Sequence, residues 1–253
     1  PEPSLTYSVT SGSVVGSDTF SGSLLRASGT NAGTYTISQG TLANSNYAIE
    51  FVTGTLTINK ASQAALTMTT TSVVYGTSTV LGSSGGSGDG AVSYAVTSAG
   101  TAGCSLSGAT LSTTGGVGTT CTVTATKAAS TNYNQVSSSA TTITVASRAI
   151  TITATAKTKQ YSQDDPELTY TITSGALAGS DTLTGSLTRA SGENVGTYAI
   201  SQGSLTNSNY TITYFGANLT IEGRPITVTA STRTKAFGEA DPSFGYTITS
   251  GSL

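Results

Sequence analysis

The side chains able to do chemistry are few, and most of them are carboxylates and tyrosine hydroxyls. The chain of 253 residues has no His, two Cys, 12 acidic and 10 basic residues. The lack of His excludes Ser-His catalysis and His-dependent metal sites. The net charge of −2 and the absence of basic clusters argue against nucleic acid or an anionic membrane as a partner. We therefore expect no catalytic residue, no cofactor and no membrane insertion in this segment.

The densest group of carboxylates is Asp164, Asp165 and Glu167, whose oxygens are weak candidates for binding Ca²⁺. The repeated copies of this segment do not reproduce all three acidic residues, which argues against a metal site. The alternative is an Asx-type turn ahead of Pro166.

Two further carboxylates precede an arginine by the same spacing. Asp18 stands eight residues before Arg26, and Asp181 stands eight residues before Arg189. This recurrence predicts an ion pair across a hairpin in each copy, which would fix strand register more than it would add stability. An arginine that binds a ligand is the alternative.

Cys104 and Cys121 are the only thiols, and they flank the glycine-rich turn Gly115–Gly118 of a plausible hairpin. We expect a disulfide between them, which would place the chain in an oxidising compartment. Two buried free thiols are the alternative.

Tyrosines recur at matching positions and alternate with Ile and Val. In a chain without Trp, Tyr is the largest available core residue, so we expect these side chains in the core. A platform that stacks against sugars is the alternative. The recurring residues are Tyr7, Tyr35, Tyr47, Tyr170, Tyr198 and Tyr210.

Internal repeats organise the chain. The motif Tyr-x-(Val/Ile)-Thr-Ser begins at residues 7, 94, 170 and 246, and the dipeptide Asn-Tyr begins at residues 46, 132 and 209. Residues 2–58 and 165–221 align without gaps and share 35 identical residues in 57 positions. Recurrence of two markers in the same phase predicts an array of modules.

The start signals Arg148-Ala-Ile-Thr-Ile-Thr-Ala154 and Arg224-Pro-Ile-Thr-Val-Thr-Ala230 define the module boundaries. We divide the chain into module one (1–59), which has no opening strand; a divergent module two (60–147); a complete module three (148–223); and an opening fragment (224–253). The linkers Asn59-Lys60, Ala146-Ser147 and Glu222-Gly223 leave little slack, so neighbouring modules should be coupled end to end.

The secondary structure predicted for module three consists of strands. Apolar residues alternate with Thr in the opening strand and in Leu168–Ile172, and further strands are expected near 183–188, 197–201 and 210–221. The predicted fold class is all-β, a tandem array of small β-sandwich (Ig-like) modules. A β-grasp arrangement with one short helix is the alternative.

These motifs resemble a known family. The run Asp165-Pro166-x-Leu-Thr-Tyr170-Thr-Ile-Thr-Ser-Gly175, followed by Gly185-Ser-Leu-Thr-Arg189 and Asn209-Tyr210-Thr-Ile212, is similar to the MBG-type repeats of large bacterial surface adhesins. Module two, with Tyr75-Gly76 and the two Cys, resembles the bacterial Ig-like repeats that accompany them. The family usually has Tyr-Gly near the end of the opening strand, where Tyr161-Ser162 departs from the pattern.

The resemblance implies a non-enzymatic structural segment of a stalk or fibre at the bacterial cell surface, which extends a distal binding region and supports adhesion or biofilm. Its partners would be neighbouring repeats of the same polypeptide. The alternatives are a module that binds surface glycans and a filament subunit that joins other copies by strand donation.

The two incomplete ends lead to one more expectation. We expect the sequence to be a window of a longer repetitive polypeptide, with the missing strand just upstream and the rest of the fourth module downstream. In the alternative, residues Arg224–Ala240 of one chain complete module one of the next chain.

Overall fold

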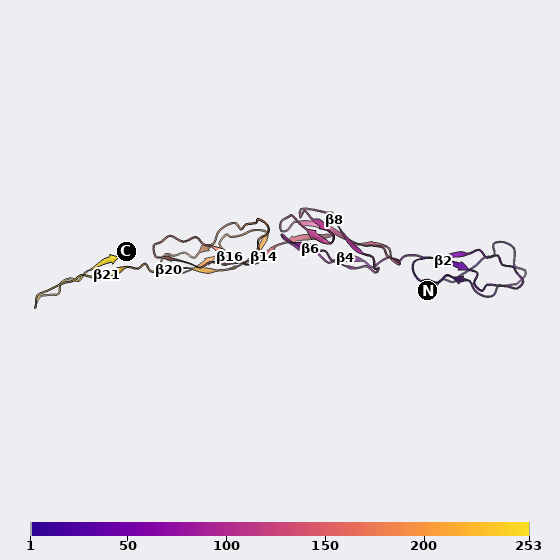
Figure 1. Cartoon of the computed structure of the whole chain (residues 1–253), viewed down its shortest axis with the longest axis horizontal. Coiled ribbons are helices and arrows are strands. Elements are labelled where there is room, and N and C mark those ends of the chain that lie inside the picture. Colours follow the sequence, from indigo (N-terminus) through magenta and orange to yellow (C-terminus); the bar gives the residue numbers. More distant parts are fainter. Residues whose placement is uncertain (1, 253) are drawn as a thin grey trace. The chain divides into compact units, whose positions relative to one another are not determined.

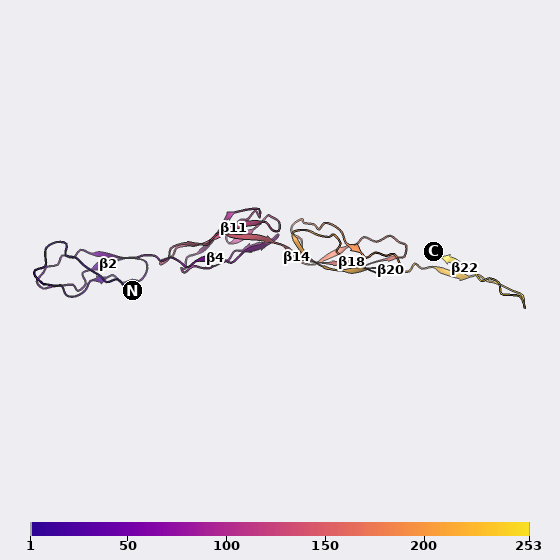
Figure 2. The same cartoon turned by 180° about the vertical axis from the view of Figure 1, so that it is seen from behind.

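A computed structural model describes residues 2–252, and every regular element in that range is a β-strand (Figures 1 and 2). This confirms the all-β class, and the β-grasp alternative lacks its helix within those residues. It follows that the same residues hold no helix able to span a membrane. The chain forms two compact units. The first extends to Ser72 and includes Ser78–Ser112 and Thr120–Thr144, and the second includes Val73–Thr77, Thr113–Thr119 and the chain from Val145 onward.

Module one, in the first unit, contains a single antiparallel sheet of three strands in the order β1-β2-β3. Its strands are β1 (Leu25–Arg26), β2 (Gly33–Ser38) and β3 (Gly54–Ile58). A bridge between Ser21 and Ala43 extends the pairing beyond this sheet. Among the large apolar side chains of residues 2–59 only Leu42 is buried, so the core of module one is thin.

Module two is built from three sheets, in which β4 pairs with β7, β10 lies between β6 and β9, and β11 pairs with β8, β12 and β13. The alternation of buried and half-buried residues along β11 is typical of a central strand. The strands are β4 (Leu66–Met68), β5 (Ser72–Val74), β6 (Ser78–Val80), β7 (Ser83–Gly85), β8 (Val92–Ser98), β9 (Ser105–Ser107), β10 (Thr110–Ser112), β11 (Thr120–Lys127), β12 (Val136–Ser137) and β13 (Thr141–Ala146).

Cys104 and Cys121 form a disulfide, which confirms the expected pairing. Both residues are buried. Cys121 lies in β11, whereas Cys104 directly precedes β9, so the bond ties the central strand of one sheet to an outer strand of another.

Module three, in the second unit, folds as two sheets with the orders β16-β14-β19 and β15-β20-β18-β17. Both sheets contain a parallel pair, β14 with β19 and β15 with β20. The strands are β14 (Arg148–Ala154), β15 (Lys157–Gln160), β16 (Tyr170–Ser174), β17 (Thr188–Arg189), β18 (Gly196–Ser201), β19 (Tyr210–Phe215) and β20 (Ala217–Glu222).

The expected strand 210–221 is therefore two strands that belong to different sheets. The chain passes from one sheet to the other at Gly216, where an added Cβ would lie 2.9 Å from the Ile200 carbonyl oxygen. The opening segment makes the same change of sheet between β14 and β15.

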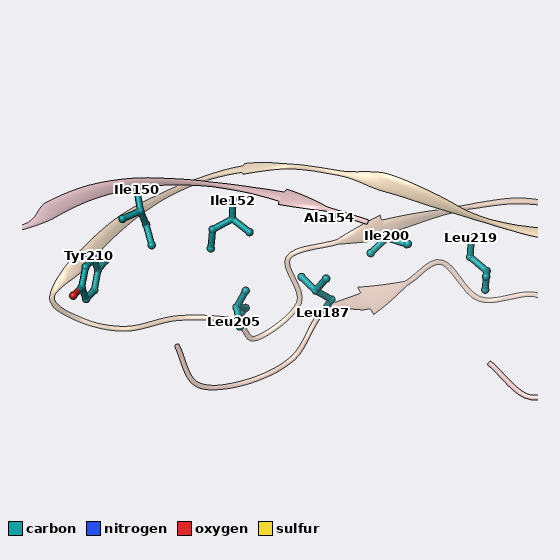
Figure 3. Close-up of a cluster of buried hydrophobic side chains, with 8 residues drawn as sticks. All are labelled: Ile150, Ile152, Ala154, Leu187, Ile200, Leu205, Tyr210 and Leu219. Carbon is teal, nitrogen blue, oxygen red and sulfur yellow. The ribbon is translucent and has the colours of Figure 1, made fainter. Parts of the chain in front are cut away.

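The core of module three lies between its two sheets (Figure 3). Ile150, Ile152 and Ala154 point inward from β14, because the side chains of a strand alternate between its faces. They pack on side chains of the opposite sheet and its loops, namely Leu187, Ile200, Leu205 and Leu219, with Tyr210 at one end.

The opening fragment is a two-stranded antiparallel hairpin of β21 (Thr227–Ala230) and β22 (Tyr246–Ser250). Every residue of β21 is exposed. The hairpin repeats the pairing of β14 with β16, including the register shift near the start of the first strand.

Candidate functional site: the module junctions

The Asn-Tyr dipeptide that marks the repeats stands at the end of a turn closed by an earlier asparagine. The Asn209 N–H donates to Oδ1 of Asn207 at 3.0 Å, and the Tyr210 N–H donates to the Asn207 carbonyl oxygen at 3.0 Å. Module one has the same turn, in which the Asn46 N–H donates to Oδ1 of Asn44 at 2.9 Å. This Asx turn fixes the position of the asparagine side chain that follows it.

The tyrosine of the dipeptide anchors a second loop. The Tyr210 hydroxyl donates to Oδ2 of Asp181 at 2.7 Å and accepts the Ala178 N–H at 2.7 Å. Burial is the main cause that raises the pKa of Tyr210. In module one the Tyr47 hydroxyl makes the same two contacts, with Asp18 and with the Val15 N–H.

In the second unit, the side chain of Asn209 reaches across the linker into residues of module two. Its Oδ1 accepts the Val117 N–H at 3.0 Å, while its carbonyl oxygen accepts the Arg148 N–H at 3.0 Å. One asparagine thus holds both the glycine-rich loop of module two and the start of β14.

Tyr75 of module two covers the same end of module three. Its ring packs edge-on against Tyr210, with 5.8 Å between the ring centroids. A hydrogen bond to Asp181 is the main cause that raises the pKa of Tyr75. Gly76 is required beside it, because it has a φ of 68° and an added Cβ would lie 2.5 Å from Cβ of Ala178.

In the first unit, Asn132 plays the equivalent part between modules one and two. Its Oδ1 accepts the Ala32 N–H at 2.7 Å, its Nδ2 donates to Oδ1 of Asn31 at 3.0 Å, and its carbonyl oxygen accepts the Ala61 N–H at 2.9 Å. Sequence reasoning used the Asn-Tyr dipeptide only as a repeat marker and missed this role. The sequence features that could have indicated this role are the recurrence of the dipeptide asparagine once per module and the shortness of the linkers.

The predicted ion pairs Asp18–Arg26 and Asp181–Arg189 are wrong. Both aspartates instead accept a hydrogen bond from the tyrosine of the dipeptide. Arg26 pairs with Glu2, and the equivalent Arg189 pairs with Asp165. Equal spacing in two copies showed that the residues have fixed roles, but it could not show which carboxylate faces which arginine.

In module three the ion pair between Arg189 and Asp165 is extended by Lys159 and Glu193. Arg189 bonds Asp165 through Nε at 2.6 Å and also contacts Glu193. The buried Lys159 lies 2.6 Å from a carboxylate oxygen of each acid. The alternating charges close the loop ahead of β18 onto the end of β15. Lys159 and Arg189 hold the Asp165 carboxylate, and within residues 2–252 no group of three or more acidic, His or Cys side chains is arranged to bind a metal ion.

Acid should destabilise module three through this network. The pKa of Asp165 is lowered chiefly by hydrogen bonding to Arg189 and then to Lys159, and the pKa of Glu193 is lowered by the same two cations. Both carboxylates bind protons more weakly in the folded chain, so their stabilisation is complete above an unfolded pKa of about 4. It is lost as the pH falls through the folded values.

Thermal melting followed between pH 7 and pH 2 checks this expectation. The Asp165→Asn variant should lose less stability in acid than the unmodified chain, because it has one fewer carboxylate to protonate. Parallel pH profiles for the two proteins would contradict the assignment.

The tyrosines predicted to be core residues differ in their surroundings. Tyr210 is buried, whereas Tyr7 is 48% exposed, so the prediction is wrong for Tyr7. Tyr47 and Tyr170 are half-buried. Tyr35 and Tyr198 are also half-buried but support loops. Their hydroxyls donate to the carbonyl oxygens of Asn31 and Asn194, and their rings lie under the guanidinium groups of Arg26 and Arg189.

Comparison with known proteins identifies the repeats. The family model of the MBG domain (YGX type) matches residues 1–57 and 150–220, so the chain belongs to this family. No curated protein matches the chain. Among solved structures, the crystal structure of Drosophila N-cadherin EC1-4 is similar, with a TM-score of 0.29 and 10% identity over 76% of this chain. The match covers 58% of the N-cadherin chain.

Proposed function

We propose that the chain is a structural, non-enzymatic segment of a stalk or fibre of an extracellular adhesin at the bacterial cell surface. In this role its repeats hold a distal binding region away from the cell and support adhesion or biofilm. Membership of the MBG family supports the proposal. The partners of each module in this function are the neighbouring repeats.

One observation carries the proposal, namely the repeated use of the Asn-Tyr asparagine across a linker. Asn132 and Asn209 each accept a backbone N–H from the preceding module through the side chain, and their carbonyl oxygens accept the N–H of Ala61 and of Arg148, near the start of their own modules. Domains that act independently on one chain do not need hydrogen bonds across their linkers. A stalk does, because consecutive modules without such bonds would rotate freely about the linker.

Loss of the Asn209 side chain should loosen the linker between modules two and three. In the Asn209→Ala variant the Val117 N–H loses its acceptor, so we expect its hydrogen exchange to accelerate about 2- to 10-fold, as a net 0.5–1.5 kcal/mol hydrogen bond predicts. Small-angle scattering of the full chain should show a broader distribution of dimensions. Amide exchange followed by NMR reports on Val117 directly.

Asn46→Ala is the matched control. Asn46 occupies the same turn in module one, and within residues 2–252 its side chain bonds no other module. This variant should leave both the Val117 amide and the scattering profile unchanged. If the Asn209 and Asn46 variants behave alike, the junction asparagine does not couple modules and the stalk proposal loses its support.

A further inference from the structure

Module three shows what a complete repeat contains. Its β14 lies between β16 and β19, antiparallel to the first and parallel to the second. Ile150 and Ile152 are among the most buried side chains of the chain, and the Thr residues between them face outward. Figure 3 shows both isoleucines pointing from β14 toward Leu205 and Leu187.

Residues 2–59 contain both flanks of this position but no strand between them. Residues 7–11 correspond to β16, and residues 47–52 correspond to β19, by the ungapped alignment of the two modules. Neither segment forms a strand in the structure. The Tyr47 N–H donates to the Asn44 carbonyl oxygen at 3.1 Å. The other backbone N–H and C=O groups of residues 7–11 and 48–52 take part in no strand ladder and can pair with an added strand.

The apolar side chains beside this position are correspondingly exposed. Tyr7 and Val9 are 48% and 49% exposed, although their counterparts Tyr170 and Ile172 are only partly exposed. The difference extends into the core. The half-buried residues Leu24, Ile37, Leu56 and Ile58 correspond to the buried residues Leu187, Ile200, Leu219 and Ile221.

We propose that module one is a strand acceptor, which binds an extended segment of the opening-strand pattern Ile-Thr-(Ile/Val)-Thr-Ala supplied from outside residues 1–59. The segment would lie antiparallel to residues 7–11 and parallel to residues 47–52. Its two branched apolar side chains and its Ala would fill the space that Ile150, Ile152 and Ala154 fill in module three, while its Thr residues would face solvent. This is recognition by β-strand addition, in which the backbone gives affinity and alternate side chains give specificity.

The register of the bound strand follows from module three. Ile150 pairs with Ile212, and Ile152 pairs with Tyr214. The first isoleucine of the guest therefore faces Ile49, and the second faces Phe51. The carbonyl oxygen of Asn46 would accept the first N–H of the guest, as the carbonyl oxygen of Asn209 accepts the Arg148 N–H.

The chemistry of the position favours one kind of guest. Apolar side chains line it, so it needs a guest with apolar residues at every second position. The remainder of the chain offers one further segment of this pattern, Ile226–Ala230, whose β21 already pairs with β22 in its own hairpin. The inference does not depend on the stalk proposal, because it concerns module one alone.

A synthetic peptide with the sequence of residues 148–158 tests the proposal on the full chain. We expect saturable binding with one peptide per chain. At a peptide concentration 100 times its Kd, hydrogen exchange of residues 47–58 should slow by about 100-fold, as ligand linkage requires. Exchange in module three should not change, because its own β14 fills the position.

A peptide of the same length with Ile150→Asp and Ile152→Asp is the control, since it keeps the backbone donors but not the apolar side chains. Equal binding of the two peptides, no binding of either, or protection confined to residues 224–252 would overturn the proposal.

A second copy of the chain could also supply the guest strand. In that case light scattering would show oligomers that the native peptide dissociates and that Val228→Asp abolishes. This outcome would support the acceptor site and identify residues 226–230 as its donor. Oligomers that neither treatment affects, in a chain that binds no peptide, would count against it.

Discussion

Replacing Leu219 by Ala should lower the free energy of unfolding of module three by about 2–5 kcal/mol, the range for a fully buried leucine that leaves a cavity. Leu219 is completely buried in the core of this module. Its strand β20 pairs with both β15 and β18, so neither neighbour can move in to fill the space without breaking a ladder. Amide exchange of β18 and β20 as a function of urea measures the loss.

Leu56→Ala is the matched comparison, because Leu56 occupies the same position in module one but is only half-buried. We expect a cost of about 1–2 kcal/mol there, since less apolar surface returns to water. An equal cost at the two positions would mean that the core of module one is already closed, which would also argue against an open strand position.

Removing the disulfide should destabilise module two by about 3 kcal/mol, the value that the chain-entropy model assigns to a loop of this size. The bond closes a separation of 17 residues and holds β11, the strand that pairs with β8, β12 and β13. In the variant with Cys104→Ala and Cys121→Ala, amides of β11 should therefore exchange faster together with their neighbours in the sheet.

Module three supplies the internal control for this experiment, since its core contains neither cysteine. Exchange of β18 and β20 should be the same in the oxidised chain and in the double variant. If protection in module three falls as far as in module two, the disulfide acts on the whole chain and not on one module.

The fold class could be predicted because the local pattern and the tertiary structure agree. Thr alternates with Ile in Arg148–Ala154, and the structure buries the Ile side chains and turns the Thr residues outward. The parallel pairing of β14 with β19 could not be predicted. Strand direction depends on which segments meet in space, and alternation is the same for both directions.

The site was predicted in part. The pairing of Cys104 with Cys121 needed only the count of thiols, because no other partner exists. The partners of Asp18 and Arg26 required knowledge of the fold, since a tyrosine 29 residues away and a glutamate 24 residues away compete for them. Tyr7 is exposed although the residues around it alternate as they do around Tyr170, because no strand within residues 2–59 pairs with residues 7–11. Exposure of this kind depends on the neighbouring positions of the sheet, which local alternation does not show.

The two parallel pairs of module three determine how it bears tension. Its opening segment pairs side by side with its closing segment in both sheets, β14 with β19 and β15 with β20. Pulling Arg148 away from Glu222 therefore slides two parallel segments past each other along their length. The hydrogen bonds between them are loaded together in shear, whereas a hairpin pulled from its open end would lose its bonds one at a time. Module three can thus resist a force that pulls its two ends apart along the direction of these strands.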